Sequence, residues 1–248
     1  MHCELRVSHN LHLSAHSLTM RLATGFDIVG FGHKDGLIGA YCVAAVNALA
    51  QLKEWRGDAA GANTSRAMHR RAVATYNAEL WNESAGFYSD WKDENGLRRN
   101  YLYTWNNLLT IDPLAGIANS TQASAIIRAM DARYAALRSE FGKDAGSHGL
   151  WCPPSNMLPA ERYDLQHNGT DCDQADYPHY ENGNCFLCYM GYELSGRALA
   201  GTGRPALEVF RTAMGNFNSS KMTMLSRFVA LSVLLTQKAF SALLRAEL

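Results

Sequence analysis

The chain has 248 residues, of which 47 % are hydrophobic, and its 23 basic side chains balance its 23 acidic ones. This length allows one large domain with a sizeable core, or two small domains. The zero formal net charge does not favour nucleic acid or an anionic membrane as the main partner, because both select proteins with excess basic charge. An uncharged polar ligand suits such a chain at least as well.

The sequence does not predict a metal or cofactor site. Six cysteines occur at irregular spacing, and the single CxxC pair, Cys185 and Cys188, has no second pair to complete a zinc site. Asp171, Asp173 and Asp176 lack the spacing and terminal Glu of an EF-hand, so we expect a solvated loop there. The phosphate-binding patterns G-x-G-x-x-G and G-x-x-x-x-G-K-[ST] are absent. We therefore expect no cofactor and no metal.

The targeting signals point in two directions. The N-terminus lacks a basic region followed by an apolar one, so we expect no signal peptide, and no apolar run is long enough to predict a membrane span. However, five N-x-[ST] triplets occur, whereas chance predicts roughly two, and this excess suggests a secretory origin. The triplets begin at Asn63, Asn82, Asn119, Asn168 and Asn218.

Two helices are predicted after an N-terminal segment, residues 1–25, that has no clean hydrophobic period. In "GLIGAYCVAAVNALAQLKEWRGD", apolar side chains recur at helical spacing from Leu37 to Leu52. Gly57 ends this helix, and Asp58 caps a second helix over residues 60–81.

An aromatic-rich break, "LWNESAGFYSDWKDENG", follows the second helix. Gly86 and its polar neighbours end the helix, and "KDENG" predicts a turn. Between them, the residues from Phe87 to Trp91 are typical of a short extended piece.

The next helix starts near Thr104 and meets Pro113, which predicts a kink or a break. Ser120 or Thr121 then caps the amphipathic helix "QASAIIRAMDARYAALRSEF". Residues 142–180 form a long irregular stretch, and loops of this length inside a domain are usually functional.

The last part of the chain again predicts helices. "YENGNCFLCYMGYELSGRALAGTG" resumes a helix that ends between Gly201 and Gly203, a short helix covers residues 205–215, and a strong helix ends the chain. Helical hairpins with short turns on one side and long loops on the other stack into a toroid or solenoid. The long loops would then line one open face.

Four stretches, in this order, resemble segments of one family. "YNAELWNESAGFYSDW" is similar to the recurring N-x-x-L-W-[DN]-E-x-x-G-x-Y-x-D stretch of the six-hairpin, (α/α)6-toroid glycoside hydrolases, which include processing-glucosidase, trehalase and rhamnosidase-like groups. The other three are "GHKDGLIGAYCVAAVNALAQLKEWRGD", "NNLLTIDPLAGIANSTQASAIIRAMD" and "PHYENGNCFLCYMGYELSGRALAGTGRPALEVF". The resemblance implies an all-α fold, an (α/α) toroid of helical hairpins with small β-hairpin-like turns in its loops.

The resemblance divides the chain into three parts. Residues 26–217 are expected to form a carbohydrate-active toroid domain, whereas residues 1–25 and the C-terminal helix at 218–248 do not match the family. A full toroid has twelve helices in six hairpins, and about seven or eight are expected here. We therefore expect an incomplete toroid, that is, a fragment of the family's fold.

The resemblance also implies a reaction, the cleavage of glycosidic bonds with inversion. A general acid protonates the leaving oxygen, and a second carboxylate activates water. Asp27, in a Gly-flanked loop comparable to an acidic loop of the family, is the candidate acid, and a turn or helix-cap aspartate is the alternative. Glu181, in "HYENG", is the second candidate. The loop near the C-terminus that carries the family's second carboxylate is not found here.

Aromatic and amide side chains supply the candidate sugar-binding residues. Sugars present C–H faces that pack on rings, while their hydroxyls need planar hydrogen-bonding partners. The candidates lie in loops or at helix starts, and the alternative is that their rings only cover helix ends. They are Trp91, Trp105, Asn106, Trp151, His179, Tyr180 and Asn182.

Two other functions remain open. A sugar isomerase or epimerase of the same architecture would use histidines as acid and base, and His148 and His179 are the best placed for it. A non-catalytic helical domain would bind a protein partner through an exposed apolar groove. The expected partner of the leading hypothesis is a carbohydrate substrate.

Overall fold

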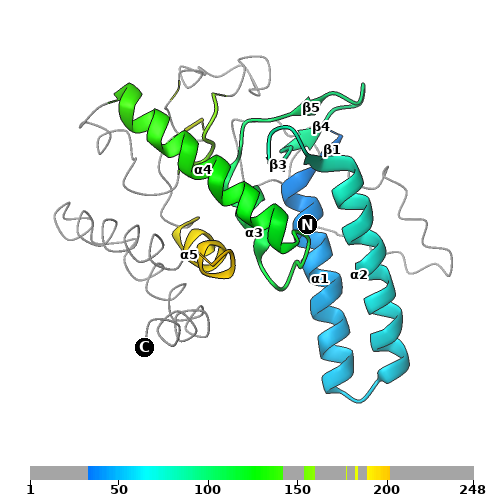
Figure 1. The fold of residues 1–248 in the computed structure, drawn as a ribbon. Helices are drawn as coiled ribbons and strands as arrows, with labels where there is room; N and C mark the ends of the chain where they lie inside the picture. Colours follow the sequence, from blue (N-terminus) through cyan, green and yellow to red (C-terminus); the bar gives the residue numbers. More distant parts are fainter. Residues whose placement is uncertain (1–32, 142–153, 160–176, 178–181, 184–188, 202–248) are drawn as a thin grey trace, which may run out of the picture.

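The computed structural model describes residues 33–141, 154–159, 177, 182–183 and 189–201. This part of the chain contains five helices and two small sheets, and Figure 1 shows their arrangement. In chain order the elements are β1 (Lys34–Asp35), α1 (Gly36–Trp55), α2 (Ala59–Leu80), β2 (Trp81–Asn82), β3 (Phe87–Tyr88), β4 (Trp91–Lys92), β5 (Arg98–Arg99), α3 (Thr104–Ile111), α4 (Ser120–Phe141) and α5 (Met190–Leu199). The predicted segment 1–25 and the predicted helices after residue 204 lie outside the described residues.

The helices α1 and α2 form a long antiparallel hairpin, as their apolar spacing predicts (Figure 1). Gly57 follows α1 with a φ of 78°, a conformation that favours glycine. Asp58 caps α2 by accepting a hydrogen bond from the main-chain N of Gly61 (2.8 Å). Gly39 lets the helices approach, because a Cβ at that position would lie 3.2 Å from the ring of Tyr76. Both predicted helices and the predicted Asp58 cap are confirmed.

The predicted break at Pro113 is also confirmed. α3 ends at Ile111, and Asp112 has a ψ of 131°, since a proline disfavours the helical conformation in the residue before it. The predicted cap of α4 at Ser120 or Thr121 is wrong by one residue. Asn119 is the cap, and it exchanges two hydrogen bonds with Gln122 in a capping box.

The prediction of an all-α toroid is wrong for the described residues. Five helices accompany two antiparallel sheets, one with the order β1-β4-β5 and one made of β2 and β3. The buried main chain between α2 and α3 must pair its N–H and C=O groups. It does so by strand pairing, both within the segment and with β1. In the pairing of β1 with β4, Asp35 lies opposite Trp91.

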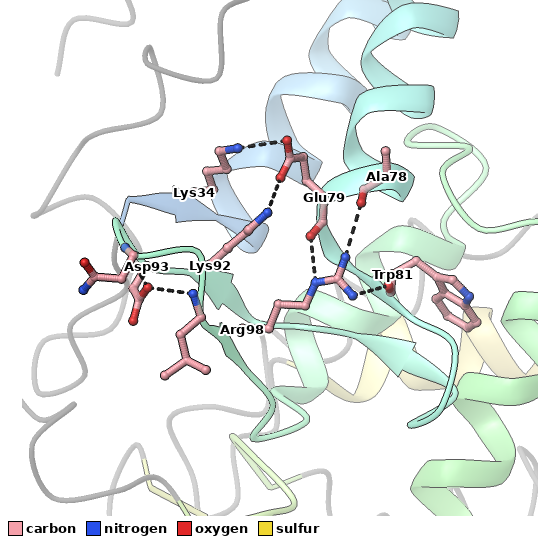
Figure 2. Close-up of polar contacts among 9 residues, drawn as sticks. Lys34, Ala78, Glu79, Trp81, Lys92, Asp93 and Arg98 are labelled. Carbon is pink, nitrogen blue, oxygen red and sulfur yellow. Dashed lines mark hydrogen bonds and ion pairs between the residues drawn. The ribbon is translucent and has the colours of Figure 1, made fainter.

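Ion pairs attach the three-stranded sheet to the end of α2 (Figure 2). The carboxylate of Glu79 on α2 accepts from Lys34 on β1 and from Lys92 on β4, each at 2.9 Å. Both lysines lower the pKa of Glu79 by hydrogen bonding and charge. One carboxylate therefore connects two strands to the helix.

Arg98 on β5 caps the C-terminal end of α2. Its guanidinium donates to three main-chain carbonyl oxygens that have no partner within the helix (Figure 2). The acceptors are Ala78 (3.3 Å), Glu79 (3.1 Å) and Trp81 (3.0 Å). A cation at this position also interacts favourably with the helix dipole.

Within the described residues, α1 is the one helix with the length and apolar composition of a membrane span. Core helices pass the same test, and α1 packs against both α2 and α3. Its buried face joins the core at Leu37, Ala40 and Val43. Length and composition are thus weak evidence for a membrane span.

Candidate functional site

The break between α2 and α3 is organised around Asn107 on α3. Its Oδ1 accepts from the main-chain N of Tyr88 (2.8 Å), and its Nδ2 donates to the carbonyl oxygens of Tyr88 and Tyr103, each at 3.2 Å. The side chain of Asn107 is fully buried. An amide that pairs both with strand β3 and with the residue before α3 fixes these two elements relative to each other.

Asp90 is a buried carboxylate that organises the start of α3. Its Oδ2 accepts from the main-chain N of Tyr101 (2.7 Å) and its Oδ1 from that of Tyr103 (2.9 Å). Leu102, between these donors, has a φ of 53°, which is strained for leucine and turns both N–H groups toward one carboxylate. Burial raises the pKa of Asp90 to about 7, although these hydrogen bonds oppose the shift.

Asp35 is a second buried carboxylate, at the start of α1. Its Oδ1 accepts from the main-chain N of Ile38 (3.0 Å) and caps the helix, whereas its Oδ2 has no hydrogen-bond partner among the described residues. Burial raises the pKa of Asp35 to about 6. The hydroxyl of Tyr76 lies nearby and donates to the carbonyl oxygen of Gly36 (2.9 Å) and to Oδ1 of Asn106 (3.0 Å).

An aromatic cluster surrounds Trp105 where α1, α3 and α5 meet. The ring of Tyr41 on α1 meets Trp105 edge-on, with centroids 5.9 Å apart. Tyr189, which precedes α5, and Tyr192 on α5 lie at 5.3 and 6.4 Å from Trp105, with tilted rings. The hydroxyls of Tyr41 and Tyr192 are 3.4 Å apart. Tyr41 is exposed and Trp105 and Tyr192 are partly exposed, so this Trp105 cluster reaches the surface.

Described polar residues that precede α5 in the chain are attached to the start of α3. The main-chain N of Thr104 donates to the carbonyl oxygen of Ser155 (2.9 Å). Asn156 pairs with Tyr103 in an isolated β-bridge and donates from Nδ2 to Oδ1 of Asn182 (2.9 Å). The main-chain N of Gly183 donates to Oγ of Ser155 (2.9 Å). The position of Asn182, next to Glu181 in the sequence, is therefore tied to the residues just before Trp105.

The predicted site residues differ in their exposure, and several of them lie outside the described residues. Among those that the structure describes, Trp105 is partly exposed, while Trp91 is 2 % exposed in the core, and Asn106 and Asn182 are fully buried. The roles of these residues in sugar binding remain predictions. The other candidates lie outside the described residues: Asp27, Trp151, His179, Tyr180 and Glu181.

Several residues of these clusters were not predicted as site residues. Tyr189 and Tyr192 are three positions apart, a helical spacing that places both rings on one face. Tyr41 lies on the apolar pattern of α1 and is typical of a core residue. Asp90 is the last residue of "GFYSD", and the sequence carries no signal that a carboxylate there is buried.

No protein-family model matches the chain. No curated protein matches it either. The resemblance to toroid glycoside hydrolases thus remains a prediction from the sequence.

Proposed function

We propose that this chain is a carbohydrate-active domain that binds an uncharged sugar at the Trp105 cluster and cleaves glycosidic bonds by inverting general acid/base catalysis. The observation that carries the proposal is the cluster itself. An indole with a partly exposed surface lies beside the exposed ring of Tyr41 and the partly exposed ring of Tyr192, and such rings pack on the C–H faces of sugars. The phenolic hydroxyls of Tyr41 and Tyr192 can donate to and accept from sugar hydroxyls.

The charges beside the cluster support an uncharged ligand. Glu193 follows Tyr192 on α5 and is fully buried, and its Oε1 accepts from Nε of Arg197 at 2.9 Å. Its Oε2 accepts from the hydroxyl of Tyr134 (3.1 Å). Because the acid and the base satisfy each other in the interior, neither offers a charge to a ligand on the surface.

The proposed catalytic carboxylates are Asp27 as the acid and Glu181 as its counterpart, and both lie outside the described residues. Asp35 and Asp90 are not proposed for this role. Both are buried, and their oxygens hold the starts of α1 and α3. The hydrogen bond from Asn156 to Asn182 supports the choice of Glu181. Asn182, the next residue in the sequence, is thereby attached to the segment that presents Trp105.

Binding is tested by titrating the full chain with neutral disaccharides and aryl glycosides while following tryptophan fluorescence. Trp105→Ala should weaken binding by about tenfold or more, because a ring stacked on a sugar contributes on the order of 1 kcal/mol beyond the buried area. Trp55→Ala is the matched control. Trp55 is 85 % exposed at the other end of α1, roughly 20 Å along the helix from Tyr41. Equal losses in both variants, or no binding by the wild type, would contradict the proposed site.

Hydrolysis is tested by the release of reducing sugar and by the anomer formed first. Asp27→Asn and Glu181→Gln should each abolish release and leave binding at the Trp105 cluster intact, because they remove proton transfer and not the rings. Full activity in either variant would reject the assignment of that residue. A product with the mass of the substrate would identify an isomerase instead.

A further inference from the structure

Three of the five N-x-[ST] triplets lie in the described part of the chain, and the structure distinguishes between them. A glycan is most easily carried by an asparagine Nδ2 that is accessible and makes no internal hydrogen bond, because the sugar replaces one of its two hydrogens and needs room beside the chain. The triplets at Asn63, Asn82 and Asn119 can be compared on this criterion. Those at Asn168 and Asn218 lie outside the described residues.

Asn119 meets the criterion through its role as the cap of α4. Its Oδ1 accepts from the main-chain N of Gln122 (2.9 Å), and its own N donates to Oε1 of Gln122 (3.0 Å). Because Oδ1 faces the helix, Nδ2 on the same planar amide faces away from it. This Nδ2 makes no hydrogen bond to the described residues, and both Asn119 and the triplet's Thr121 are exposed.

The other two triplets are engaged in the fold. Nδ2 of Asn82 donates to Oδ1 of Asn100 (3.3 Å), and Oδ1 of Asn82 accepts from the triplet's own Ser84 (2.8 Å). Asn63 is exposed, but it lies inside α2, and the triplet's Ser65 is buried. Its Oγ accepts from Nζ of Lys53 (3.2 Å). In neither triplet are both polar side chains exposed and free of hydrogen bonds within the fold.

We propose that Asn119 is an acceptor for an N-linked glycan, carried by the chain when it is secreted. The donor is an oligosaccharide linked to a lipid through a diphosphate. Nδ2 of Asn119 forms a bond to the anomeric carbon, and the bond from that carbon to the diphosphate oxygen breaks. The lipid diphosphate leaves with the electron pair, and the amide loses one proton. Because Oδ1 takes no part, the cap of α4 is retained in the glycosylated protein.

The test is expression of the full chain through the secretory pathway of a yeast, followed by peptide mapping. Peptide N-glycosidase converts each glycosylated asparagine to aspartate, so modification at residue 119 appears as a mass increase in its peptide. The wild type should show this conversion at Asn119. Thr121→Ala should lose it while keeping the asparagine, and Asn119→Asp should lose it while keeping an oxygen that caps α4.

Asn63→Gln is the matched control, and it should leave modification at Asn119 unchanged. Thermal unfolding of Asn119→Asp should match that of the wild type treated with the glycosidase, since both carry aspartate as the cap. An unmodified Asn119 in secreted wild-type protein, or modification that survives Thr121→Ala, would overturn the proposal. Neither result depends on whether the Trp105 cluster binds sugar.

Discussion

Replacement of Asp35 by Asn would measure what one buried charge costs this fold. Asp35 is 2 % exposed, and only its Oδ1 has a hydrogen-bond partner among the described residues. Burial raises its pKa to about 6, and the main-chain N–H groups of Ile38 and Leu37 oppose that shift. Asparagine keeps an oxygen that can cap α1 but carries no charge at any pH.

The magnitude and the sign follow from the two pKa values. An aspartate in the unfolded chain titrates near pH 4, about two units lower, and each unit corresponds to about 1.4 kcal/mol. Ionisation of Asp35 therefore destabilises the folded state by about 3 kcal/mol. Because the pKa of Asp35 is higher in the folded state, the protonated carboxyl contributes fully to the free energy of unfolding below pH 4. This contribution is lost as the pH rises through 6.

The assay is urea unfolding of the wild type and of Asp35→Asn at several pH values between 4 and 8. The difference in the free energy of unfolding should move by about 3 kcal/mol in favour of the variant between pH 4 and pH 8. Asp90 titrates in both proteins, so its contribution cancels in the difference. Asp35→Ala should show the same pH dependence, shifted by about 1 kcal/mol for the lost cap. A difference independent of pH, or one that favours the wild type as the pH rises, would refute the reasoning.

Two further substitutions address packing in the interior, and urea unfolding measures both. Gly36→Ala should destabilise the fold by about 2 kcal/mol or more, because the new Cβ would lie 2.6 Å from the carbonyl oxygen of Asp90 and 2.8 Å from Nδ2 of Asn106; an unchanged unfolding midpoint would contradict this. Arg197→Met should cost about 3–5 kcal/mol by leaving the buried carboxyl of Glu193 without its partner base, and adding Glu193→Gln should recover part of the loss. Additive losses in the double variant would show that the two side chains do not act as a pair.

The helices were predictable because their signals are local. α1, α2 and α4 each extend over 20 or more residues, so the apolar period repeats several times within each element. Asp58 and Pro113 act on residues next to them in the chain, and their effects were also predicted. The cap of α4 was misplaced by one residue because Asn119, Ser120 and Thr121 are all good caps.

The extended piece from Phe87 to Trp91 was predicted and contains β3 and the start of β4. The pairing of the strands into sheets was not predictable, because each strand has two residues and its partner lies elsewhere. Alternation needs several residues to be visible, whereas β1 and β4 each offer one residue per face. Their pairing joins Lys34 to Lys92 across the whole α1–α2 hairpin. Such non-local pairing leaves no trace in the local composition, and it separates this fold from the predicted toroid.

Trp105 is the one residue of the aromatic cluster that the sequence offered as a candidate, and its surroundings depend on tertiary structure. In "TWNN" Trp105 and Asn106 were both candidates and Asn107 was not, and nothing local distinguishes the three. Successive residues of a helix point about 100° apart, so α3 partly exposes the indole and turns both amides inward. Which of the three faces the surface depends on how α3 packs against α1 and α5, and the local pattern does not contain that information.

The buried carboxylate of Asp90 connects the fold to the proposed site. It accepts from the main-chain N–H groups of Tyr101 and Tyr103, and the strained conformation of Leu102 persists because both hydrogen bonds are made. Trp105 follows Tyr103 by two residues, so the turn that Asp90 stabilises also sets the direction of the Trp105 ring. The aromatic-rich break between α2 and α3 would therefore act on a ligand of the proposed site only indirectly: its carboxylate positions the helix start, and the helix positions the indole.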